Sequence, residues 1–154
     1  MKLRHALLVL AVAGLAVIGL AAPASAKAKS GTEHILALSN SSSSKRYTVI
    51  GIGPIHARGV DIQLSATKDR FKFPDGALLV KHNPKHDHNM SDPKTCLQTY
   101  TESGTYTVTG GTGAYKTATG HGKYSLSIIA VGCSQSRPPK PFQLQLRASG
   151  PLTK

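Results

Sequence analysis

Three histidines lie within one polar stretch of the chain. His82, His86 and His88 follow the pattern His-x-x-x-His-x-His, with Asp87 and Met90 beside them. Imidazole nitrogens suit copper, zinc or nickel, and the Met90 thioether could add a soft ligand for cuprous ion. The spacing matches no zinc motif, so solvated surface histidines are the alternative. We therefore expect no cofactor, with copper or zinc binding at these three histidines as the competing hypothesis.

A second candidate pair could perform acid–base chemistry. His56 and Asp61 lie five positions apart, and desolvation inside a barrel could shift their pKa values. In the same segment, however, Val60, Ile62 and Leu64 alternate with polar residues. Asp61 has the opposite phase to this apolar set, so we expect it on a solvated face.

The sequence indicates no catalytic nucleophile. The serine-rich stretch 39–44 is typical of a flexible loop, and no nucleophile motif surrounds a serine or a cysteine. The sequence thus assigns no catalytic residue and slightly disfavours an enzyme.

The N-terminal residues indicate export. Lys2 and Arg4 precede an uncharged apolar run over residues 6–22, and Ala24-Ser25-Ala26 supplies a small-residue cleavage site. We predict a signal peptide over residues 1–26 and a secreted domain over 27–154 without a membrane span. A membrane anchor is the alternative.

Two cysteines, Cys96 and Cys133, are present in this chain. An even pair in an exported protein predicts a structural disulfide, because the compartment is oxidising. A catalytic thiol is the competing interpretation.

The chain is strongly basic. It has 19 Lys and Arg side chains against 7 Asp and Glu, a formal net charge of +12. Such a charge attracts anionic cell-surface polymers. The basic residues are scattered and do not alternate with aromatic ones, which argues against a specific nucleic-acid site. A solvated basic surface is the simpler interpretation.

Period-two alternation dominates after residue 30, and helical periodicity is nearly absent. We expect strands over 34–38, 47–52, 60–64, 70–73, 77–81, 95–101, 105–109, 124–128 and 142–149. Pro74-Asp75-Gly76 and Glu102-Ser103-Gly104 would form turns. The stretches 82–94 and 131–141 would form surface loops. Eight or nine short strands of this kind predict an all-β sandwich or closed barrel.

One glycine-rich segment, residues 110–122, is the most distinctive part of the chain. Lys116 follows a tyrosine where a phosphate-binding loop requires glycine, and a strand pattern follows where a dinucleotide fingerprint requires a helix. Both nucleotide interpretations therefore fail. Glycine at this density is typical of a tight bend or bulged corner of a sheet.

The same segment resembles a motif of the allene oxide cyclase barrel superfamily, which includes dirigent proteins and many small secreted bacterial proteins. The matching residues are Gly111, Gly113 and Tyr115, then Ala118, Gly120 and Gly122. Phe73-Pro74-x-Gly76 resembles a hairpin of the secreted members. The resemblance implies a single antiparallel eight-stranded β-barrel with a mostly apolar interior, in which these six residues shape the barrel.

Three functions are compatible with these observations. The first is a secreted barrel that binds a small apolar molecule in its interior. The second is a cyclase- or isomerase-type enzyme acting on a hydrophobic substrate in the same cavity. The third is an accessory protein that binds metal or anionic surfaces. The resemblance transfers no catalytic residue, and the oligomeric state is not indicated.

Overall fold

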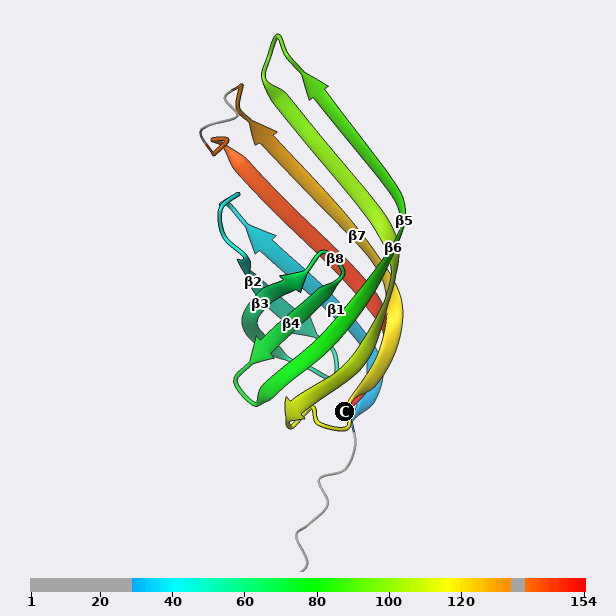
Figure 1. Ribbon diagram of the computed structural model, residues 1–154. Coiled ribbons are helices and arrows are strands. Elements are labelled where there is room, and N and C mark those ends of the chain that lie inside the picture. The colour runs from blue at the N-terminus through cyan, green and yellow to red at the C-terminus, as the bar shows by residue number, and fades with distance from the viewer. Residues whose placement is uncertain (1–28, 134–137) are drawn as a thin grey trace, which may run out of the picture.

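Eight antiparallel strands close into a barrel in which each strand pairs with its neighbours in sequence and β8 returns to β1 (Figure 1). The computed structural model describes residues 29–133 and 138–154, so the predicted signal peptide lies outside the described residues. The strands are β1 (Ser30–Ser39), β2 (Arg46–Ile52), β3 (Ala57–Ser65), β4 (Lys68–Phe73), β5 (Gly76–Asp92), β6 (Leu97–Gly113), β7 (Thr119–Val131) and β8 (Phe142–Thr153). The expected eight-stranded antiparallel barrel is confirmed. No helix in the described part of the chain is long and apolar enough to cross a membrane.

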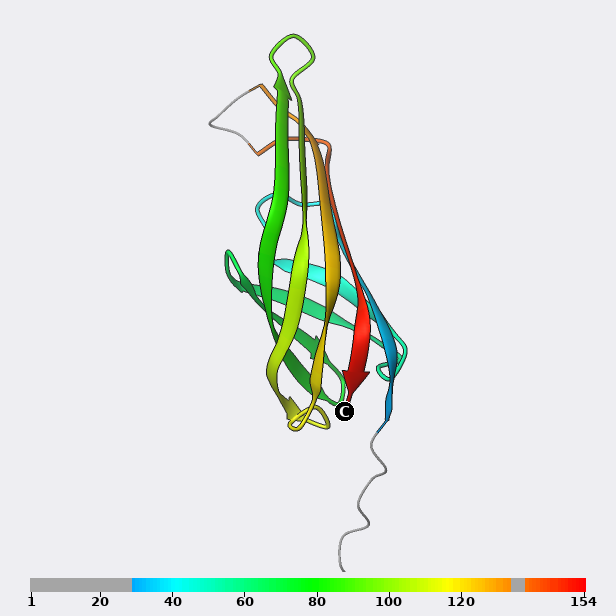
Figure 2. The ribbon, with the colours of Figure 1, turned by 90° about the vertical axis from the view of Figure 1, so that its right-hand side faces the viewer.

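The strands differ greatly in length. β5 and β6 have 17 residues each, whereas β4 has only 6. As a result β5–β8 extend past the short strands as a wall that rises above one end of the barrel, with the β5–β6 hairpin reaching furthest (Figures 1 and 2). We call this the open end. It holds the β1–β2, β3–β4, β5–β6 and β7–β8 connections, and the opposite end holds both termini of the barrel.

Two expectations for the extended wall were wrong. The predicted loop 82–94 belongs to β5 as far as Asp92, and the predicted turn at Glu102-Ser103-Gly104 is an uninterrupted part of β6. β4 pairs with β5 only up to Lys81, so β5 is an edge strand beyond that point. An edge strand tolerates Pro84, which lacks an N–H, and a register shift follows it.

The expected orientation of β3 was also wrong. Asp61 is 2% exposed, whereas Val60 and Leu64 are 39% and 48% exposed. The polar phase of this strand therefore faces the barrel interior, and the apolar phase faces outward. At the open end the interior is a cavity and not a packed core, and the side of this cavity to which β3 belongs is polar.

The other end of the barrel is closed by the glycine-rich segment. Gly111 and Gly113 end β6, Tyr115 and Ala118 lie buried in the β6–β7 turn, and Gly120 and Gly122 begin β7. Gly113 has a φ of 59°, which glycine adopts without strain. Tyr115 packs edge-on against Phe73 with ring centroids 5.9 Å apart. The segment is thus a tight turn whose tyrosine closes the barrel.

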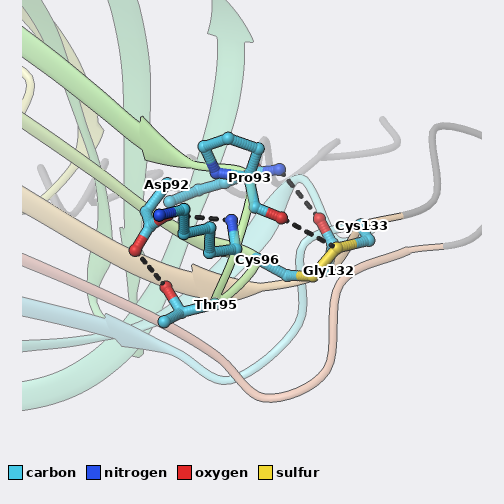
Figure 3. Close-up of a disulfide and its surroundings, with 8 residues drawn as sticks. Asp92, Pro93, Thr95, Cys96, Gly132 and Cys133 are labelled. Atoms are coloured by element: carbon cyan, nitrogen blue, oxygen red, sulfur yellow. Dashed lines mark hydrogen bonds between the residues drawn. A yellow bond between two sulfur atoms is a disulfide. The ribbon is translucent and has the colours of Figure 1, made fainter.

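A disulfide joins the two hairpins of the extended wall. Cys96 in the β5–β6 turn is bonded to Cys133 in the β7–β8 connection, as expected (Figure 3). Asp92 holds the same turn, because its carboxylate accepts hydrogen bonds from the Lys94 N–H at 2.8 Å and the Thr95 hydroxyl at 2.7 Å. The disulfide therefore fixes the tips of β5–β8 relative to one another.

Candidate ligand-binding site

A cavity of about 430 Å³ lies inside the barrel toward its open end. One side of it is apolar and comes from β7 and β8. The other side is polar and comes from β2 to β7. The lining residues are Leu126, Ile128, Phe142, Leu144 and Leu146 on the apolar side, and Tyr47, Asp61, Gln63, Asp69, His82, Tyr100, Glu102 and Tyr124 on the polar side, with Ser42 and Ala66 from two connections at the open end.

His82 and Asp69 form a pair in this cavity. The Nε2 atom of His82 lies 2.9 Å from Oδ2 of Asp69, and Asp69 is 6% exposed. The His82 ring also packs edge-on against Tyr124, with centroids 5.4 Å apart. β4 and β5 place the pair, since Asp69 and Val80 are register partners and His82 follows Val80 on the same face. His82 is thus a fixed cavity side chain.

Glu102 is held by two tyrosines. The hydroxyls of Tyr100 and Tyr124 each donate a hydrogen bond of 2.6 Å to its carboxylate. The hydrogen bond to Glu102 raises the pKa of Tyr100 to about 12. Burial, and then the same carboxylate, raise the pKa of Tyr124. Both phenols therefore stay protonated at neutral pH and remain hydrogen-bond donors.

Asp61 is the most unusual group of the cavity. Its Oδ1 atom is buried and has no hydrogen-bond partner among the described residues. Burial, and then the neighbouring charge of Asp69, raise the pKa of Asp61 to about 8. Tyr47, its register partner on β2, has its pKa raised by burial and by the Asp61 charge. At neutral pH the Asp61 carboxyl is therefore mainly protonated and available to a ligand.

Charge in the cavity is opposite to that of the whole protein. Three of the 7 acidic side chains of the chain line it, and the described residues that line it include no Lys or Arg. His82 is the one lining side chain that can carry positive charge, and it faces Asp69. The cavity is thus a locally acidic site in a basic protein.

The structure separates the three histidines of the candidate metal site. His82 faces the interior, whereas His86 and His88 are exposed on the outer face of β5, opposite Ser103 and Thr101 of β6. Among the described residues, no group of three His, Cys, Asp or Glu side chains is placed to hold a metal ion. Surface copper or zinc binding by His82, His86 and His88 stays a hypothesis.

The candidate acid–base pair, His56 and Asp61, is not brought together either. His56 is exposed in the connection before β3, whereas Asp61 is buried in the cavity. Asp61 instead has Asp69 as its charged neighbour.

Sequence reasoning missed most of the cavity residues, although two signals pointed to them. Asp69 has the same phase as Phe71 and Phe73 in β4, which places it on the apolar face. Tyr100 and Glu102 share the phase of Tyr106 in β6. The phase shared by Tyr100, Glu102 and Tyr106 was not recognised, because a turn was expected at residues 102–104.

A comparison of the chain with protein-family models, with curated proteins and with solved structures finds no match. The cavity itself is therefore the basis of the functional argument.

Proposed function

We propose that this barrel binds a small molecule with an apolar body in the cavity at its open end. The observation that carries the proposal is the cavity of about 430 Å³, whose β7–β8 side consists of leucine, isoleucine and phenylalanine side chains. Concave sites with apolar walls and a few convergent polar groups are typical of small-molecule binding. The resemblance of the glycine-rich segment to the allene oxide cyclase barrel superfamily supports the same role, because the cyclases act on a fatty-acid-derived substrate.

We also propose that the protein acts outside the cell. The signal-peptide pattern of residues 1–26 supports export, and the Cys96–Cys133 disulfide is compatible with an oxidising compartment. Mass determination of the N-terminus of protein isolated from the culture medium tests this point, with cleavage after Ala26 as the expected result.

Native mass spectrometry tests the ligand-binding proposal. Protein purified from the medium of the organism that makes it should carry a small molecule that dissociates at higher collision energy. Leu144→Trp should abolish this adduct, because the indole would occupy the cavity. Ile129→Trp is the matched control, since Ile129 is 47% exposed and does not line the cavity. An adduct retained by Leu144→Trp would show that the molecule binds elsewhere.

Acid–base catalysis on the bound molecule is a second candidate function. It is favoured by Asp61, a buried carboxyl with its pKa raised to about 8, beside the Asp69–His82 pair. Such a group can donate or accept a proton near neutral pH, as a cyclase- or isomerase-type reaction requires. Once the ligand is identified, incubation with protein in D₂O should introduce deuterium into it, and Asp61→Asn should prevent the exchange. A ligand that gains no deuterium and is recovered unchanged would show that the protein binds it without catalysing proton transfer.

A further inference from the structure

We infer that the ligand carries an alkylated ammonium head group in addition to its apolar body, and that this head group binds at the Asp61 side of the cavity. The inference rests on the proposed ligand-binding function, because it concerns the chemistry of the molecule that occupies the same cavity.

Acidic side chains outnumber basic ones in the cavity lining. Asp61, Asp69 and Glu102 line the cavity, and only His82 among its lining residues can offset them. His82 is already paired with Asp69, and Glu102 is satisfied by two tyrosine hydroxyls. Asp61 is left without a group of opposite charge to pair with when it ionises. In a chain with 19 basic side chains, this exclusion of Lys and Arg from the lining favours a cation supplied by the ligand.

The Asp61 carboxyl is also unpartnered. Asp61 is 2% exposed, and its buried Oδ1 lacks a hydrogen-bond partner. A buried polar group without a partner is destabilising, and a buried charge is more so unless it is paired. A cationic group placed at Asp61 would remove this penalty.

Aromatic rings are concentrated in the cavity lining. Three of the five tyrosines of the chain, Tyr47, Tyr100 and Tyr124, line this one cavity. Aromatic rings attract cations through their quadrupole, and alkylated ammonium groups are favoured ligands because they are weakly hydrated and carry apolar methyl groups. The Tyr100 and Tyr124 rings are held in place by Glu102. A primary ammonium would pair with the carboxylates but would make weaker cation–π contacts with the tyrosine rings.

Binding of such a cation would release a proton. The other titratable groups that line the cavity are Tyr47 from β2, Asp69 from β4, His82 from β5, Tyr100 and Glu102 from β6, and Tyr124 from β7, whereas the β8 lining is apolar. The Asp61 carboxyl loses its proton to solvent, and the carboxylate then pairs with the ammonium. The affinity should therefore rise with pH until the free Asp61 carboxyl is itself ionised, near pH 8. A head group that accepts a hydrogen bond would need protonated Asp61, so its affinity would fall over the same range.

Calorimetric titration with two probes tests the inference. Hexyltrimethylammonium carries a permanent charge that does not titrate, and 1-octanol is a neutral molecule of comparable length. At about pH 9 the ammonium should bind at least about tenfold more tightly than the alcohol. Between about pH 6 and about pH 9 its affinity should rise about tenfold or more, with proton release seen as a dependence of the heat on the buffer.

Two variants make the test specific. Asp61→Asn should lower the ammonium affinity about tenfold and remove the rise with pH, while 1-octanol binding stays unchanged. Asp75→Asn is the matched control, because Asp75 is an exposed aspartate outside the cavity lining and should behave as wild type.

The outcomes separate the two proposals. If 1-octanol binds but the ammonium does not, or if ammonium affinity falls with pH, the inferred head group is wrong while the apolar ligand site stands. Ammonium binding that Asp61→Asn leaves unchanged would also overturn the inference. If neither probe binds at any pH, both the head group and the proposed ligand site are overturned.

Discussion

Nε2 of His82 lies 2.9 Å from Oδ2 of Asp69 inside the barrel, so a histidine from a stretch expected to be a surface loop is a fixed part of the cavity. The pairing places a second carboxylate next to Asp61, and the Asp69 charge contributes to the raised pKa of Asp61. The electrostatics of the cavity therefore depend on three side chains from three successive strands.

The coupling between the two aspartates can be measured directly. Asp69→Asn should lower the pKa of Asp61 below its value of about 8, because a like charge beside it is removed while its burial is retained. Carboxyl carbon chemical shifts followed by NMR across the pH range report this pKa. Asp75→Asn should leave it unchanged. An Asp61 pKa that does not fall in Asp69→Asn would mean that burial alone raises it.

The stability of the fold should decrease as pH rises from about 4 to about 8. The unfolded chain loses the Asp61 proton near its ordinary pKa of 3.8, whereas the folded protein keeps it up to about pH 8. The unfolded state therefore binds fewer protons in this window, which gives a slope of about 1.4 kcal/mol per pH unit from this group. Burial raises the pKa of Glu33 as well, so its contribution has the same sign. Urea unfolding at several pH values measures the slope.

Asp61→Asn is the control for this pH dependence. The asparagine side chain is neutral at all pH values and close in shape to a protonated carboxyl, so the free energy of unfolding should vary less with pH than in the wild type. Asp75→Asn should retain the full slope. A wild-type stability that increases over this window would contradict a protonated Asp61 in the folded state.

Much of the architecture could be predicted from the sequence, because alternation and turn residues are local signals. The inward phase of β8, the turn at Pro74-Asp75-Gly76 and the disulfide were all expected. The cavity was not, because alternation defines two faces of a strand without showing which one is enclosed. In β3 the apolar residues face solvent and Asp61 faces inward, since the other strands surround a cavity that is half polar. The prediction of a surface loop over 82–94 was wrong for a related reason. These polar residues form a strand because they pair with β6, and that pairing leaves no local signal in the sequence.

Glu33 should be essential to the closed end of the barrel. It is 2% exposed, and its Oε2 accepts a hydrogen bond of 2.7 Å from the N–H of Ile55, which is fully buried. Glu33→Ala should lower the free energy of unfolding by about 2–4 kcal/mol, because it leaves a cavity and an unpartnered N–H. Glu33→Gln keeps an acceptor and the side-chain volume, so its loss should be smaller. Equal losses in both variants, measured by urea unfolding, would show that the negative charge itself is required.

Loss of the disulfide should destabilise the protein by about 4 kcal/mol on the chain-entropy estimate. Cys96 and Cys133 are separated by 37 positions, so the bond restricts a long loop of the unfolded chain. The double variant Cys96→Ser, Cys133→Ser should unfold at lower urea concentration than the wild type. Wild-type protein kept under reducing conditions is the control and should match the variant. Unchanged wild-type stability on complete reduction would contradict the expectation.

Tyr115 should stabilise the barrel without taking part in ligand binding. Its ring is 1% exposed, packs edge-on against Phe73, and carries the Lys154 ammonium 4.8 Å from its centroid. A Cβ atom at Gly76 would lie 3.1 Å from the same ring, so the glycine allows it to pack closely. Tyr115→Ala should lower the free energy of unfolding by about 3–5 kcal/mol.

Tyr115→Phe separates the contribution of the ring from that of the hydroxyl. It keeps the ring and its packing, so its urea midpoint should stay close to that of the wild type. Because the ring lies at the closed end, away from the cavity lining, this variant should also bind hexyltrimethylammonium with wild-type affinity. A large loss of affinity in Tyr115→Phe would mean that the two ends of the barrel are coupled. It would contradict a purely structural role for the glycine–tyrosine segment.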